Sequence, residues 1–157
     1  MKTEELSYLV ISRLKREGLT LATAESCTGG LIGKSLTDIS GASAVYLGGV
    51  ISYTNGVKQR LLGVEPSTLE ACTAVSRETA KEMARGAREV VKADLGVSVT
   101  GLAGPDGDGT GRPVGLVYIA IDGIGFSFCK ELHLEGDRPE IREQAAAAVL
   151  QMILDFT

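Results

Sequence analysis

Residues 25–30, Glu-Ser-Cys-Thr-Gly-Gly, place two candidate nucleophiles directly before two glycines. An extended run, 20–24, precedes this segment, and apolar residues at helical spacing follow it. The N-terminus of a helix presents unpaired N–H groups and the positive end of the helix dipole. Ser26 or Cys27 could therefore attack a carbonyl carbon while N–H groups at Gly29 and Gly30 hold the oxyanion. A simpler interpretation is that Ser26 or Thr28 only caps the helix, which is the commoner use of these residue types.

Lys58 is the candidate general base for Ser26. The only histidine, His133, lies on the polar face of a predicted edge strand, and nothing in the sequence brings it to Ser26 for a Ser-His-Asp triad. Lysine replaces histidine in Ser-Lys hydrolytic sites, provided that burial or a cationic neighbour lowers its pKa. Lys58 follows a predicted strand at the sheet edge where Ser26 is expected. Spacing alone still favours a solvated lysine, and Glu25 is an alternative base.

Two further interpretations of the segment around Ser26 are disfavoured. Adjacent side chains that leave a strand point in opposite directions, so Ser26 and Cys27 should not both face one site. A cysteine at such a place is more often a small buried apolar residue. Residues 28–35 end in Gly-Lys-Ser, as phosphate-binding loops do, but the Walker spacing needs a glycine where this sequence has Thr28.

Two segments later in the chain could contact a ligand. The glycine-rich loop 101–111 follows a predicted strand, and glycines there allow a ligand to approach the backbone, although a merely flexible loop is equally expected. Arg138 lies in the first turn of the last predicted helix and could bind a phosphate or carboxylate. An exposed arginine without a ligand is the commoner arrangement.

The predicted secondary structure decides whether these residues meet. Apolar spacing and capping residues predict helices at 3–16, 28–39, about 57–62, 66–70, 76–91 and 137–153. Strands are predicted at 20–24, 45–53, 95–100, 114–121 and 124–134, with 45–53 buried on both faces and Asp122-Gly123 as a two-residue hairpin turn. Helices that alternate with buried strands indicate an α/β fold, a three-layer α/β/α sandwich on a mixed β-sheet. No linker interrupts the pattern, so residues 1–157 are expected to form a single domain.

Composition limits the class of protein. A chain of 157 residues with 44% hydrophobic content can bury a sizeable core. The net charge of −4 gives no electrostatic footprint for nucleic acid. No apolar run reaches the ~20 residues of a membrane span, and the N-terminus does not resemble a signal peptide, so we expect a cytoplasmic protein. Cys27, Cys72 and Cys129 lack paired spacing, which argues against a disulfide frame and against a zinc site.

Four groups of residues, in this order along the chain, resemble the CinA C-terminal domain family, also known as nicotinamide-nucleotide amidases. They are Glu-Ser-Cys-Thr-Gly-Gly at 25–30, Ser-Tyr-Thr-Asn at 52–55 with Lys58, Val-Ser-Val-Thr-Gly-Leu-Ala-Gly-Pro-Asp-Gly at 97–107, and Gly-Asp-Arg at 136–138. The resemblance covers about residues 4–155. It implies that the chain hydrolyses the amide of nicotinamide mononucleotide to nicotinic acid mononucleotide and ammonia in the bacterial cytoplasm, with no metal and no other cofactor.

The resemblance also assigns roles to individual residues. The nucleophile of the family falls on Ser26 and its general base on Lys58. Its accessory catalytic and substrate-contacting positions fall on Tyr53, Ser43, Thr100 and Arg138. Longer relatives carry an N-terminal domain with metal-dependent pyrophosphatase activity that this sequence does not contain, so no metal chemistry is expected.

The expected partners follow from this assignment. They are a small pyridine nucleotide and further copies of the chain as a homo-oligomer, with no nucleic acid and no membrane. An alternative is a non-catalytic nucleotide-binding or partner-recognition module linked to competence or damage responses. The intact set of Ser26, Tyr53 and Lys58 favours the enzyme, because a binding module would not need it.

Overall fold

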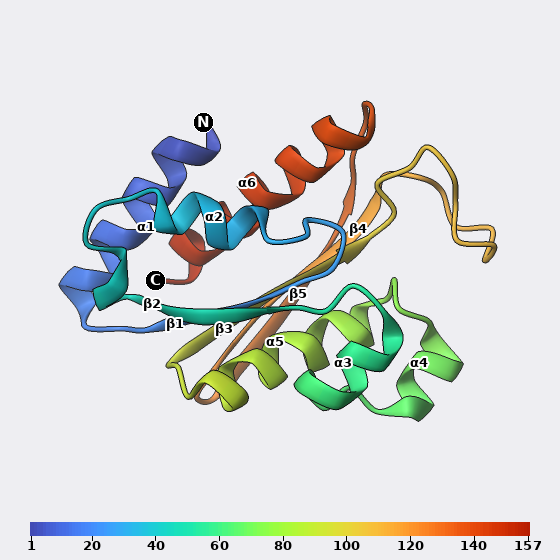
Figure 1. The fold of residues 1–157 in the computed structure, drawn as a ribbon, viewed down its shortest axis with the longest axis horizontal. Helices are drawn as coiled ribbons and strands as arrows, with labels where there is room; N and C mark the ends of the chain where they lie inside the picture. The colour runs from blue at the N-terminus through green and yellow to red at the C-terminus, as the bar shows by residue number, and fades with distance from the viewer.

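A five-stranded mixed sheet forms the centre of the molecule (Figure 1). The structure is a computed structural model that describes all 157 residues. The strand order is β2-β1-β3-β4-β5. β1 (Leu21–Glu25) pairs in parallel with β2 (Tyr46–Ile51) on one side and with β3 (Leu95–Gly101) on the other. β4 (Leu116–Gly123) and β5 (Phe126–His133) continue the sheet as antiparallel strands.

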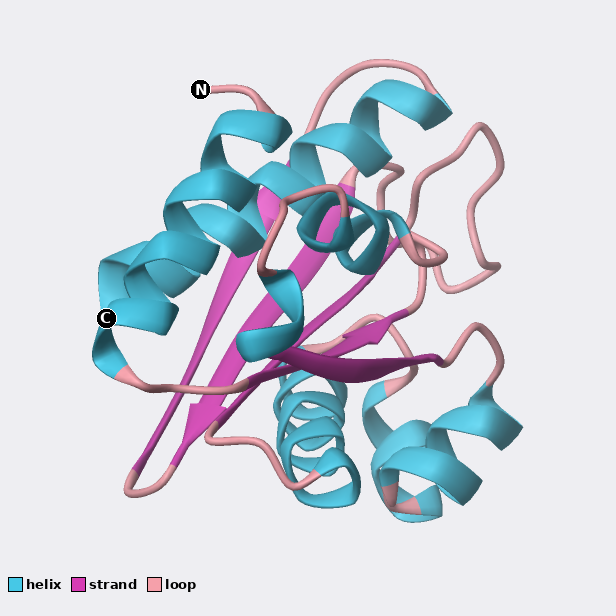
Figure 2. Ribbon diagram, turned by 60° about the vertical axis from the view of Figure 1, so that its left-hand side comes forward, coloured by secondary structure: helices cyan, strands magenta, loops and turns pink.

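Helices cover both faces of this sheet (Figures 1 and 2). One face carries α1 (Thr3–Glu17), α2 (Leu31–Thr37) and α6 (Arg138–Phe156). The other carries α3 (Asn55–Leu62), α4 (Pro66–Cys72) and α5 (Arg77–Val91), and a short 3₁₀ turn, η1 (Ala42–Ala44), precedes β2. The predicted three-layer α/β/α sandwich is confirmed. None of the helices combines the length and apolar character that a membrane span requires.

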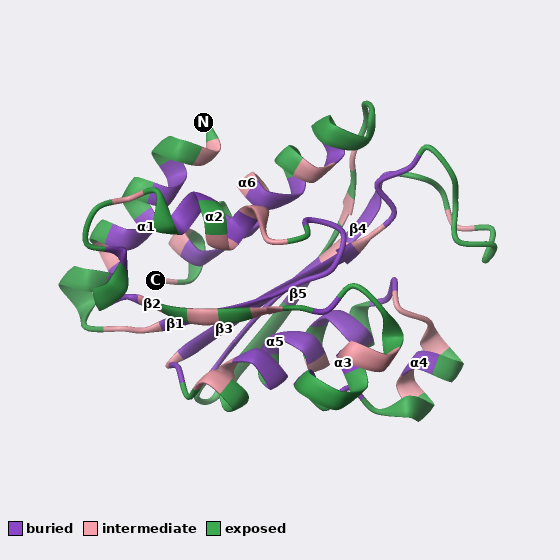
Figure 3. Ribbon diagram, viewed as in Figure 1, coloured by how far each residue is buried: buried purple, intermediate pink, exposed green.

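The core has one apolar layer on each side of the sheet, and the central strands are buried between them (Figure 3). The larger layer, of 24 buried residues, packs α1, α2 and α6 onto the sheet, and a smaller one of 8 residues packs α5 with parts of α3 and α4. A Cβ at Gly86 of α5 would collide with the backbone carbonyl of Leu62 at the end of α3. Glycine at this point therefore lets α3 lie directly against α5.

Local capping fixes where the long helices begin. The Ser76 hydroxyl accepts a hydrogen bond from the Thr79 N–H group at the start of α5. Asp137 and Glu140 form the predicted capping box at the start of α6. Arg138 is consequently the first residue of α6.

Two predictions about the sheet are wrong. The segment 45–53 is not buried on both faces, because β2 lies at the edge of the sheet and its burial alternates. The hairpin turn is not Asp122-Gly123 but Ile124-Gly125, since Gly123 pairs with Phe126. The Asp122 carboxylate accepts a hydrogen bond from Nε of the partly buried Arg88 of α5, at 2.6 Å. This contact keeps Asp122 within β4. Gly125 then supplies the positive φ of 85° that the turn requires.

The helix after β1 is shorter than predicted. α2 begins at Leu31 rather than near Thr28. Gly29 and Gly30 have φ values of 58° and 107°, so the chain turns at these residues before the helix starts. Ser26 and Thr28 therefore lie in a loop between β1 and α2.

Candidate active site

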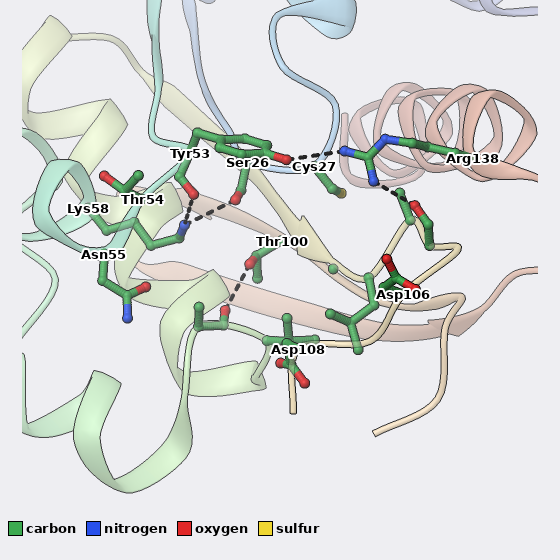
Figure 4. Close-up of a pocket in the computed structure, with 16 residues that line it drawn as sticks. Ser26, Cys27, Tyr53, Thr54, Asn55, Lys58, Thr100, Asp106, Asp108 and Arg138 are labelled. Atoms are coloured by element: carbon green, nitrogen blue, oxygen red, sulfur yellow. Dashed lines mark hydrogen bonds between the residues drawn. The ribbon is translucent and has the colours of Figure 1, made fainter. Parts of the chain in front are cut away.

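The carboxyl ends of the three parallel strands open onto one cavity of about 310 Å³. Ser26 follows β1, Tyr53 lies just beyond β2, and Thr100 lies at the end of β3. Ligands bind at this edge in many open α/β sheets. Lys58 of α3 and Arg138 of α6 complete the ring of predicted site residues around the cavity (Figure 4).

The side chains of Ser26 and Lys58 contact each other at the cavity. The Lys58 Nζ atom lies 3.0 Å from Ser26 Oγ, although 32 positions separate the two residues in sequence. Lys58 also donates to the Ser52 carbonyl oxygen at 2.7 Å. A third contact, to the Tyr53 carbonyl oxygen, is 3.4 Å long (Figure 4). Only 1% of the Lys58 residue is exposed, so the expectation of a solvated surface lysine does not hold.

The surroundings of Lys58 favour its neutral form. No carboxylate forms an ion pair with Lys58, and burial lowers its pKa to about 8. A neutral amine has two hydrogens and one lone pair. If the two carbonyl groups of residues 52 and 53 accept the hydrogens, the lone pair faces Ser26 Oγ. In this state Lys58 can take the proton of the Ser26 hydroxyl.

Cys27 borders the cavity beside Ser26, so the expectation that only one of the two residues reaches the site does not hold. Cys27 is 6% exposed and packs into the larger apolar layer. Burial raises the pKa of its thiol to about 11, and the nearby charges of Arg142 and Lys58 offset this only in part. A thiol that stays protonated is a poor nucleophile, so the geometry favours Ser26.

Glu25 occupies the N-terminus of α2 instead of the cavity. Its buried carboxylate accepts hydrogen bonds from the Thr28 hydroxyl at 2.7 Å, the Ile32 N–H group at 2.9 Å and the Gly33 N–H group at 3.0 Å. These contacts leave Glu25 engaged with α2, away from the Ser26 hydroxyl, so Lys58 is the better candidate base. They also replace the predicted cap, because neither Ser26 nor Thr28 caps α2.

We expect Glu25→Gln to destabilise the fold by roughly 2 kcal/mol, because the glutamine amide group would point a donor at N–H donors and lose the favourable charge at the helix N-terminus. The free energy of urea unfolding measures this change. Glu4→Gln is the matched control, since Glu4 is an exposed acidic residue in the first turn of α1. Equal and small effects for both variants would contradict the assigned role of Glu25.

Gly29 and Gly30 do not reach the cavity. The Gly29 N–H group donates to the Ser26 carbonyl oxygen at 3.1 Å, and Gly30 faces Ile51 of β2 on the other side of the loop. Because Glu25 fills the N-terminus of α2, the predicted oxyanion site at these glycines is not available. Ser43 also lies outside the cavity. It is exposed in η1, next to the amino end of β2, whereas the cavity lies at the carboxyl end.

Tyr53, Thr100 and Arg138 do border the cavity. One guanidinium nitrogen of Arg138 donates to the Tyr53 hydroxyl at 3.1 Å, and another donates to the Gly104 carbonyl oxygen at 2.6 Å. The buried Thr100 hydroxyl donates to the Ala74 carbonyl oxygen at 2.8 Å and so ties the end of β3 to the cavity wall. His133 lies on the exposed face of edge strand β5, where it contacts Glu131.

Comparison with known proteins places this arrangement in a family. The family model of the CinA C-terminal domain matches residues 3–157. The chain belongs to the CinA C-terminal domain family. A protein of Caldanaerobacter subterraneus, named as competence-damage inducible, is 49% identical over 150 residues. The match covers 96% of this chain and 36% of that relative, so this chain spans about a third of the length of such CinA relatives.

Solved CinA structures share the whole fold. The competence/damage inducible protein CihA from Agrobacterium tumefaciens is 42% identical with a TM-score of 0.94, over 98% of this chain and 94% of that chain. A competence-damaged protein (CinA) superfamily protein from Enterobacter cloacae is 34% identical with a TM-score of 0.96, over 100% of this chain and 94% of that chain.

Sequence reasoning missed three residues around this CinA site. Asp106 and Asp108 of the glycine-rich loop line the cavity, so this loop forms part of the cavity wall. Arg142 of α6 does not line the cavity but contacts the backbone of the loop that carries Ser26. Its spacing of four residues from Arg138, one helical turn, was the only signal in the sequence that could have pointed to it.

Proposed function

We propose that this chain is an amidohydrolase that deamidates nicotinamide mononucleotide to nicotinic acid mononucleotide and ammonia with a Ser26–Lys58 pair. The observation that carries the proposal is the 3.0 Å contact between Lys58 Nζ and Ser26 Oγ, made by a buried lysine without a counter-ion. Such a pair is the recognisable geometry of a nucleophile and its base.

The reaction would proceed in two stages. Ser26 Oγ attacks the carboxamide carbon while Lys58 Nζ takes the hydroxyl proton. Lys58 then gives this proton to the departing amide nitrogen, so that ammonia leaves and an ester to Ser26 remains. Lys58 next takes a proton from water, and the resulting hydroxide attacks the ester. Lys58 returns this proton to Ser26 Oγ as the acid leaves, and the acid then gives its own proton to ammonia or solvent as it becomes the carboxylate.

The charges around the cavity suit a nucleotide with a cationic ring. Arg138 is held by Tyr53 and Gly104 at the cavity wall, and its remaining donors could bind the phosphate. Asp106 and Asp108 add carboxylates that could accompany the pyridinium ring. This distribution supports a substrate with separated positive and negative groups.

The names of the relatives keep a second candidate open, a partner-recognition module in competence or damage responses. The burial of Lys58 without a counter-ion favours the enzyme over this module. A pKa near 8 instead of the usual 10.4 corresponds to roughly 3 kcal/mol of lost stability at pH 7. A module that only binds a partner gains nothing from this loss of stability, whereas an enzyme gains a neutral base.

We expect ammonia release from nicotinamide mononucleotide that EDTA does not inhibit, because no three His, Cys, Asp or Glu side chains lie close enough together to form a metal site. The measurement is ammonia release over a panel of nicotinamide-containing compounds, with and without phosphate. Activity that EDTA abolishes and a divalent ion restores would contradict the mechanism. No ammonia from any member of the panel, despite binding, would favour the binding module.

A further inference from the structure

Arg142 uses its guanidinium group on the backbone of the loop that carries Ser26. Its Nε atom donates to the Cys27 carbonyl oxygen at 3.0 Å, and one terminal nitrogen donates to the Thr28 carbonyl oxygen at 2.9 Å. Arg142 takes part in no salt bridge. A half-buried arginine thus makes its hydrogen bonds to two successive peptide groups next to the nucleophile.

These contacts control the direction of further groups in the loop. A trans peptide group is planar, so its N–H bond points opposite to its carbonyl bond. Arg142 holds the carbonyl group of the Thr28–Gly29 peptide, and the N–H group of the same peptide donates to the Ser26 carbonyl oxygen at 3.1 Å. The Ser26 carbonyl in turn belongs to the peptide whose N–H group is that of Cys27. Arg142 therefore fixes the direction of the Cys27 N–H group through one intermediate hydrogen bond.

The Cys27 N–H group has no hydrogen-bond partner elsewhere in the chain. The Thr28 N–H group has none either, but Thr28 has no exposed surface, whereas Cys27 borders the cavity next to Ser26. In α/β-hydrolases, the N–H group of the residue after the nucleophile contributes to the oxyanion hole. Of the two residues, only Cys27 borders the cavity, so its N–H group is the candidate donor to a bound substrate.

We propose that Arg142 is a positioning residue that holds the Cys27 N–H group as an oxyanion donor beside Ser26. The inference rests on the proposed hydrolase function and adds to it the source of transition-state stabilisation. The negative charge on the substrate oxygen develops only during attack, so an oriented donor acts on kcat more than on KM. Glu25 contacts the same loop by accepting a hydrogen bond from the Thr28 hydroxyl.

The test uses a fluorophosphonate, which labels an activated serine whatever the natural substrate and places a phosphonyl oxygen where the oxyanion would form. The rate of labelling at Ser26 is followed by intact-protein mass spectrometry. We expect Arg142→Ala to lower this rate about 10²-fold, the usual effect of losing one oxyanion donor. We also expect kcat for ammonia release to fall similarly while KM changes little. Added guanidinium ion should restore part of the labelling rate of Arg142→Ala. The labelling rate of Arg142→Lys should lie between those of wild type and Arg142→Ala.

Arg77→Ala is the matched control, because Arg77 also donates to a backbone carbonyl at 3.0 Å, that of Cys129, but lies outside the cavity. This variant should be labelled at the wild-type rate. Equal labelling of Arg142→Ala and wild type, or equal slowing in both variants, would overturn the inference. If Arg142→Ala does not fold, the comparison of Arg142→Lys with Arg77→Ala decides. Absence of labelling in the wild-type protein would instead overturn the assignment of Ser26 as nucleophile, and the inference with it.

Discussion

Replacing Ser26 with alanine is expected to lower kcat for ammonia release by about 10⁴-fold or more. Loss of the nucleophile from a coupled nucleophile–base pair removes the covalent route altogether. Ser26 Oγ is the only side-chain oxygen that contacts Lys58 Nζ, so no neighbouring side chain is placed to substitute for it. Steady-state ammonia release gives kcat, and calorimetric titration with nicotinamide mononucleotide shows whether the substrate still binds.

Cys27→Ala is the control for this experiment, because it changes the adjacent residue of similar size. We expect this variant to retain most of the turnover, since its backbone N–H group remains and its thiol is protonated at neutral pH. Some loss of stability is expected from the removal of a buried side chain. An inactive Cys27→Ala protein together with an active Ser26→Ala protein would move the nucleophile to Cys27.

Lys58→Arg should be nearly as damaging as Lys58→Ala, with a loss of at least about 10³-fold in kcat. Arginine keeps the positive charge but cannot release its proton near neutral pH. A lysine that acted only through its charge would tolerate this change. Near-normal turnover by Lys58→Arg would therefore remove Lys58 from the role of general base.

The pH dependence of turnover by the wild-type protein tests the same assignment. Because the pKa of Lys58 is lowered to about 8, only about one-tenth of the protein carries a neutral Lys58 at pH 7. We expect kcat/KM to rise about tenfold per pH unit below pH 8 and to level off above it. A rate that falls with rising pH across this range would require a different base.

The same pKa shift predicts how stability changes with pH. Between about pH 8 and pH 10.4 the unfolded chain keeps the Lys58 proton while the folded chain has lost it. The unfolded state then binds more protons, so the free energy of unfolding rises with pH in this window. Relative to Lys58→Met, the wild-type protein should gain roughly 3 kcal/mol across it. Parallel urea titrations of the two proteins would reveal the difference.

Features set by neighbouring residues could be predicted from the sequence. The capping residues Ser76 and Asp137 and the apolar spacing of α5 and α6 depend on positions within a few residues of one another. The alternation of helices and strands indicated the three layers for the same reason. The strand order could not be predicted in this way. An apolar run such as 45–53 suits a central strand and an edge strand equally, and only the packing of the whole sheet places β2 at the edge.

Those residues of the candidate site that belong to the sequence motifs could be predicted. Ser26 and Lys58 stood out through the order of the motifs, whereas spacing alone left Lys58 on the surface. Its burial depends on how α3 packs against α5 and on the carbonyl groups at residues 52 and 53. The roles of Glu25 and Arg142 could not be predicted, because both bind backbone groups whose positions exist only in the folded loop.

The contact between Arg142 and the loop of Ser26 joins segments 115 positions apart, near opposite ends of the sequence. During synthesis on the ribosome, β1, β2 and α3 emerge long before α6. Ser26 and Lys58 could therefore meet in a growing chain while the loop between β1 and α2 is still unrestrained. We expect nascent chains that end before α6 to show no hydrolysis, so that the proposed activity appears only when the C-terminal helix docks.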